Sequence, residues 1–75
     1  MPITPFLNGQ VFEPNLTEAM NIAFENACKS LKLVDKSDPL TRLVAAKIME
    51  LAAGGEHDPE RLRAGVMAVY KSAYE

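Results

Sequence analysis

The sequence predicts an all-α protein, a compact three-helix bundle with an extended N-terminal arm, in a single domain spanning residues 1–75. An acidic residue directly precedes proline three times, at Glu13-Pro14, Asp38-Pro39 and Asp58-Pro59. Proline suits the first position of a helix, and an acidic side chain before it can accept hydrogen bonds from the free N–H groups of the first turn. After each pair the apolar residues recur every three or four positions, as on one face of a helix. We therefore expect helices over residues 14–33, 39–53 and 59–73.

The arm covers residues 1–12 and contains an Asn8-Gly9 pair between two short apolar runs. Asn-Gly favours a tight type I′ turn, because both residues tolerate positive φ. A hairpin is one interpretation of this pattern. An isolated two-stranded hairpin is marginally stable in water, so we favour an extended arm that folds back over the helices. Its expected anchors are Ile3, Phe6, Leu7, Val11 and Phe12.

The first expected helix carries an apolar stripe on one side and polar residues on the other. The stripe consists of Leu16, Met20, Ala23, Phe24, Ala27, Cys28 and Leu31. Asn15 is an alternative start, because Glu18 three residues later completes a capping box. Ile22 projects among the polar residues. It is either a scattered surface residue or a contact with the arm or a second subunit.

The second expected helix is apolar around most of its circumference. Its main stripe consists of Leu40, Val44, Ile48 and Leu51, and Gly54-Gly55 provides a C-terminal cap. Leu43, Ala46 and Met49 carry apolar surface onto the other sides. A helix of this kind is usually buried on more than one side. Three helices supply few internal partners for so much surface, which indicates self-association.

The third expected helix has a stripe of Leu62, Val66, Val69, Tyr70 and Ala73. Gly65 in its middle is unfavourable for a helix by roughly 1 kcal/mol relative to alanine. Either this glycine permits a close approach of two helices, which we favour, or it has no structural role. The expected core comprises Phe24, Leu31, Val44, Ile48, Leu51, Leu62, Val66 and Val69.

Few residues are suited to catalysis or metal binding. The single cysteine, Cys28, cannot form an internal disulfide, and a lone His57 cannot complete a structural zinc site of about four ligands. Glu56 and Asp58 flank His57, but we expect a solvated loop there, with Asp58 capping the third helix. Cys28 is expected to be a buried thiol. We therefore expect no enzyme, no cofactor, no metal and no small-molecule substrate.

Composition and charge restrict the partners further. The chain is 48% hydrophobic and 24% charged, which is ordinary for a folded domain, and its net charge of −2 gives no general attraction to nucleic acid. No apolar run approaches the roughly 20 residues that cross a bilayer, so we expect no membrane association. Residues 1–10 lack the pattern of a secretory signal. With a single cysteine, this favours the cytoplasm.

Two segments carry a resemblance. PFLNGQVFEP, followed by an amphipathic helix and then by DPLTRLVAAKIMELAAGGEHDPERLR, resembles short uncharacterised bacterial proteins of comparable length. In those proteins the F-[ED]-P entry and the two Asp-Pro helix starts recur. The resemblance implies a small, stand-alone bacterial helical protein and brings no activity or functional residue with it.

The sequence thus favours a non-catalytic interaction or accessory protein, either a homodimer or a subunit that binds a protein partner. The candidate interaction surface consists of Ile22, Leu43, Ala46 and Met49. The alternative is a helix-turn-helix regulator that contacts DNA through Arg61 and Arg63 at the start of the third helix. The acidic residues of the turn before that helix weigh against this alternative.

Overall fold

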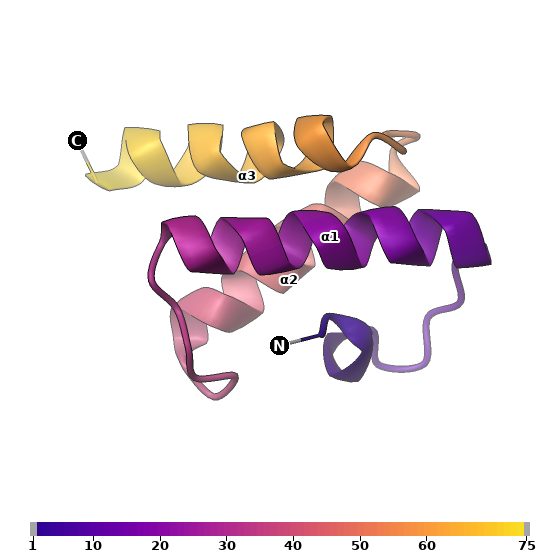
Figure 1. Cartoon of the computed structure of the whole chain (residues 1–75), viewed down its shortest axis with the longest axis horizontal. Coiled ribbons are helices and arrows are strands. Elements are labelled where there is room, and N and C mark those ends of the chain that lie inside the picture. Colours follow the sequence, from indigo (N-terminus) through magenta and orange to yellow (C-terminus); the bar gives the residue numbers. More distant parts are fainter. Residues whose placement is uncertain (1, 75) are drawn as a thin grey trace.

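Three α-helices and one short 3-10 turn form the structure (Figure 1). They are η1 (Thr4–Phe6), α1 (Pro14–Ser30), α2 (Pro39–Ala53) and α3 (Pro59–Tyr74). This computed structural model describes the backbone of residues 2–74 and the side chains of residues 2–70. α1 and α3 lie side by side and run in the same direction, while α2 crosses behind α1 in the opposite direction (Figure 1). Each helix packs against the other two, which confirms the predicted all-α three-helix bundle.

The two Asp-Pro pairs begin their helices as predicted. The Asp38 carboxylate accepts a hydrogen bond from the backbone N–H of Leu40 at 2.9 Å, and Asp58 accepts one from Glu60 at 2.9 Å. Glu13 precedes α1 but makes no side-chain cap, because the longer glutamate side chain is a poorer N-cap than aspartate. α1 nevertheless begins at Pro14, so the alternative start at Asn15 is wrong.

α1 ends at Ser30, three residues earlier than predicted. Lys32 adopts a left-handed conformation with φ 58°, and the N–H of Leu33 donates to the carbonyl oxygen of Cys28 at 2.8 Å. This is a Schellman cap, which usually has glycine at the left-handed position. α2 ends in the same way, with Gly55 at φ 107° and the N–H of Glu56 bonded to the carbonyl of Leu51 at 3.1 Å. The first of these two ends carries no glycine signal in the sequence.

The N-terminal arm folds back onto the helices, but it is not extended throughout, because η1 coils its first half. Asn8 and Gly9 form the expected turn, with φ values of 51° and 83°. No strands flank this turn within residues 2–74, so the hairpin does not form. Pro5 lacks the N–H group that a strand pairing would need. Instead, the N–H of Ile3 donates to the Asn21 side-chain oxygen of α1 at 2.9 Å.

Four of the five predicted anchors hold the arm to the bundle. Ile3 and Leu7 are buried in the core, and Phe6 and Phe12 are half-buried against it. Val11 is 94% exposed, so its prediction as an anchor was wrong. It follows the tight turn, where the chain leads out towards α1 and no helix lies against it.

The core between the helices contains most of the predicted residues. Phe24, Val44, Ile48, Leu62 and Val66 are fully buried, and Leu31 and Leu51 are half-buried at the edge. Val69 is 44% exposed, whereas its neighbour Tyr70 is buried. The buried residues of α3, Leu62, Val66 and Tyr70, follow a spacing of four, and Val69 points about 100° away from Tyr70, at the edge of this stripe. The prediction for Val69 was therefore wrong.

Gly65 allows α2 and α3 to approach closely. A Cβ atom at this position would lie 2.6 Å from Cδ1 of Leu51, which is closer than van der Waals contact allows. The glycine therefore serves the close packing that we expected.

The connection between α1 and α2 is held by two polar residues. Thr41, buried at the start of α2, donates its hydroxyl hydrogen bond to the backbone carbonyl of Asp35 at 2.9 Å. The Asp35 carboxylate accepts from the backbone N–H of Ser37 at 2.9 Å and from its hydroxyl at 2.7 Å. Both bonds lower the pKa of the Asp35 carboxyl, and the bond from the backbone N–H has the larger effect. The connection is thus an ordered turn rather than a loose link.

None of the helices described here combines the length and the apolar character needed to cross a bilayer.

Candidate functional site

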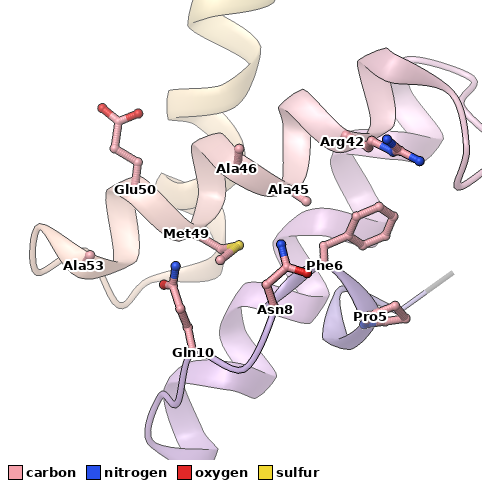
Figure 2. A pocket seen from close by; sticks show the side chains of 10 residues that line it. All are labelled: Pro5, Phe6, Asn8, Gln10, Arg42, Ala45, Ala46, Met49, Glu50 and Ala53. Carbon is pink, nitrogen blue, oxygen red and sulfur yellow. The ribbon is translucent and has the colours of Figure 1, made fainter.

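A hollow of about 780 Å³ lies between the N-terminal arm and α2 (Figure 2). Its volume falls within the range of about 300–1,000 Å³ that is typical of ligand pockets. The arm contributes Pro5, Phe6, Asn8 and Gln10. The helix contributes Arg42, Ala45, Ala46, Met49, Glu50 and Ala53.

The hollow exists because α2 presents small side chains to the arm. Ala45, Ala46 and Ala53 leave space that larger residues would fill. Along this space the arm follows the helix in the same direction, from Phe6 near Arg42 to Gln10 beside Met49 (Figure 2). The helical segment from Arg42 to Ala53 is about 16 Å long at 1.5 Å per residue. The hollow is therefore an elongated groove.

The wall formed by the arm is held in place. The Phe6 ring packs on the Phe24 ring of α1 with a centroid distance of 5.3 Å, a separation typical of favourable aromatic pairs. The hydrogen bond from Ile3 to Asn21 fixes the chain before it. A groove with both walls fixed can bind a partner without first ordering a loop, which lowers the entropic cost of binding.

The part of α2 that faces away from the core is called here the outer face. It consists of Arg42, Leu43, Ala46, Met49, Glu50 and Ala53. Leu43 is 57% exposed, Ala46 is exposed and Met49 is half-buried. These three predicted residues thus lie together on one accessible face, and two of them line the groove.

Two opposite charges lie on the outer face. Arg42 and Glu50 are eight residues apart, which is about 12 Å along the helix. Arg42 makes no ion pair with any residue that the structure describes. Glu50 pairs with Lys47 at 3.5 Å, an exposed contact of the kind that contributes little to stability. Both charges are therefore accessible to a partner that binds the apolar surface between them.

The fourth predicted surface residue, Ile22, lies elsewhere. It is 42% exposed on α1, on the side opposite the buried Ala23 and Phe24, and it does not line the groove. The structure therefore brings together three of the four predicted residues. The arm residues Phe6, Asn8 and Gln10 complete the groove. The sequence placed Phe6 among the anchors of the arm and Asn8 in its turn, but it indicated none of the three as part of the interaction surface.

The two arginines of the DNA-binding alternative lie near the start of α3. Arg61 is exposed and Arg63 is half-buried. They are two residues apart and therefore point about 200° apart around the helix. One face of α3 does not present both to a single groove of DNA, so this arrangement does not favour the alternative.

The remaining polar candidates have local roles. The Glu56 carboxylate accepts a hydrogen bond from the N–H of Asp58 at 3.3 Å, while Asp58 caps α3. His57 beside them is exposed. Cys28 is buried in the core, and this burial raises the pKa of its thiol. A raised thiol pKa disfavours the reactive thiolate. Among the residues described, no three His, Cys, Asp or Glu side chains gather as metal ligands would.

Comparisons of the chain with protein-family models, with curated proteins and with solved structures found no match.

Proposed function

We propose that this chain is a small, non-catalytic interaction protein of the bacterial cytoplasm that binds a protein partner through the outer face of α2 and the adjoining groove. One observation carries the proposal: Leu43, 57% exposed, lies on the same face of α2 as Ala46 and Met49, which line a groove of mixed polar and apolar character. A single exposed leucine is ordinary on a protein surface. An exposed leucine that adjoins further accessible apolar residues, here Ala46 and Met49, is more typical of an interaction surface.

The shape of the groove favours a helix as the binding element. It runs along α2 for about 16 Å, which corresponds to roughly three helical turns. On the α2 side it carries the apolar Ala45, Ala46 and Met49, together with the opposite charges of Arg42 and Glu50. Amphipathic helices bind such grooves by placing apolar anchors at intervals of three and four residues. Met49 and Phe6, which line the groove, are residue types that are enriched at protein interfaces.

The proposed location rests on the cysteine content of the chain. Cys28 is the only cysteine and is buried as a free thiol, which suits a reducing compartment. The bacterial origin rests on the resemblance described above. Fractionation of the source cells followed by immunoblotting tests the location. We expect the protein in the cytoplasmic fraction, and its recovery in another fraction would contradict this part of the proposal.

Site-specific photo-crosslinking in the source cells tests the binding surface. A photoreactive diazirine residue replaces Leu43 in one variant and Val69 in the control, since Val69 is also an exposed apolar residue but lies on α3 away from the groove. We expect discrete protein adducts from position 43 and few from position 69. Equal or absent adducts at the two positions would refute the proposed surface. Adducts to nucleic acid from position 43 would refute the proposed class of partner.

A further inference from the structure

We infer that the partner of the outer face is a second copy of this chain, with the two α2 helices packed antiparallel about a two-fold axis beside Ala46. This inference rests on the proposed function, because it names the occupant of the same surface. It follows from a symmetry in the positions of the exposed residues of α2.

The outer face is symmetric about Ala46 in its residue types. Leu43 and Met49, both apolar, lie three residues before and after it. Arg42 and Glu50, of opposite charge, lie four residues before and after it. At about 100° per residue, all four point within about 60° of the direction of Ala46. The face is therefore centred on Ala46 both along the helix and around it.

This pattern is complementary to itself when two copies meet antiparallel. In a two-fold interface, if one residue contacts a second residue across the axis, the second also contacts the first. Arg42 then faces Glu50 of the second copy, and the same contact occurs again on the other side of the axis. Leu43 and Met49 lie on opposite sides of the direction of Ala46, so they add apolar surface on the two flanks of these contacts. A parallel arrangement would place Arg42 against Arg42, so the charges select the antiparallel one.

Helix-packing geometry allows these contacts. Helices that cross at about 20° diverge by only about 2 Å at a point four residues, or about 6 Å, from the crossing. Ala46 at the crossing is small, which permits an interaxial distance near the lower end of the usual range of about 8–10 Å. Arginine and glutamate side chains are long enough to meet across that distance.

The arm has a part in this interface. A stable protein interface covers about 800 Å² on each partner, which is about one sixth of the 4851 Å² surface of this chain. One face of one helix does not supply so much area. The Phe6 and Gln10 side chains line the groove beside α2, so the second copy would contact the arm as well as the helix. This accounts for a groove that the chain itself leaves open.

Charge reversal in the purified full-length chain tests the inference. Sedimentation equilibrium over a range of micromolar concentrations measures the dimer dissociation constant of the wild type and of Arg42→Glu, Glu50→Arg and the double variant. We expect a wild-type dimer, and each single reversal weakens it at least about tenfold because like charges then meet at both contacts. The double reversal restores opposite charges and returns the constant to within about threefold of the wild type. Ala46→Glu gives an independent disruption at the centre of the face.

Arg61→Glu is the matched control, because it makes the same charge change at an exposed position of α3 and should leave the dimer unchanged. Circular dichroism verifies that each variant keeps its helices. A wild-type chain that remains monomeric up to near-millimolar concentration would overturn the inference, as would a double variant no tighter than the single ones. A monomer whose position 43 still crosslinks to another protein would remove the second copy but leave the proposed function intact.

Discussion

Both faces of α2 carry apolar residues, but their surroundings differ. The inner face, with Thr41, Val44, Ile48 and Ala52, is buried in the bundle with α1 and α3. The outer face carries Leu43, Ala46 and Met49, and among the described residues it is the arm that lies beside it. Apolar residues on this helix are therefore not buried merely because they are apolar. They are buried where other helices pack against them. We expect the inner face to determine stability and the outer face to determine binding.

The largest expected effect is a difference in the free energy of unfolding between substitutions on the two faces. Ile48→Ala on the inner face removes a fully buried side chain and should reduce the free energy of unfolding by about 2–5 kcal/mol. Leu43→Ala on the outer face should change it by less than about 0.5 kcal/mol when measured on the monomer. Urea denaturation at low protein concentration measures both. Similar losses for the two variants would show that the outer face also stabilises the single chain.

A second test concerns the contact between α2 and α3. Gly65→Val forces Leu51 to move and should destabilise the fold by about 1–3 kcal/mol through overpacking. Ala64→Val, at the exposed neighbouring position, should cost only a few tenths of a kcal/mol, since it affects helix propensity alone. Combining Gly65→Val with Leu51→Ala should cost less than the sum of the two single changes. Simple additivity would contradict the proposed clash.

The one buried polar side chain of the inner face gives a smaller effect. Thr41→Val keeps the shape but removes the hydrogen bond to the Asp35 carbonyl, with an expected loss of about 1–2 kcal/mol. The matched change Thr17→Val removes hydroxyl contacts to the Glu13 and Phe12 carbonyls at a half-buried position and should cost less. Thermal denaturation measures the loss of stability in the two variants. Equal losses would mean that the burial of Thr41 does not increase the contribution of its hydrogen bond to stability.

The smallest effect is a pH dependence in the connection between α1 and α2. Hydrogen bonds from Ser37 lower the pKa of the Asp35 carboxyl below its ordinary value of 3.8 in the folded chain. A lowered pKa means that the carboxylate stabilises the fold above the unfolded pKa and loses this contribution as the pH falls through the folded pKa. The stability difference between the wild type and Asp35→Asn should therefore shrink below about pH 4.

Ser37→Ala is the control for this dependence, because it keeps the carboxylate and removes the shorter of its two hydrogen bonds. Unfolding curves between neutral and acidic pH should show an intermediate dependence for this variant. An identical acid response in all three chains would contradict the assignment to Asp35.

Local chemistry explains which parts of the fold could be predicted from the sequence. Asp38 and Asp58 mark helix starts because capping involves only residues within the first turn. The end of α1 could not be predicted in the same way, since Lys32 adopts a left-handed conformation without a glycine to signal it. The choice between Val69 and Tyr70 depends on where the other helices lie, and both residues fit the periodicity.

The candidate surface, too, could be predicted from the sequence only in part. The apolar pattern of α2 indicated Leu43, Ala46 and Met49, because it continues around the helix beyond one stripe. It did not place Phe6 or Gln10 on this surface, because their position beside α2 depends on tertiary contacts, among them the bond from Ile3 to Asn21 and the packing of Phe6 on Phe24. Ile22 matched the criterion of an apolar residue in a polar setting, yet it lies apart from the groove.

The direction of the helices has an electrical consequence. α1 and α3 point the same way and α2 the other way (Figure 1), so one of the three helix dipoles has no opposing neighbour. The end where α1 and α3 begin carries the excess of positive partial charge, and Glu13, Asp58 and Glu60 stand there. A two-fold pair would oppose the excess dipoles of its members. It would therefore orient less strongly in an electric field than two separate chains.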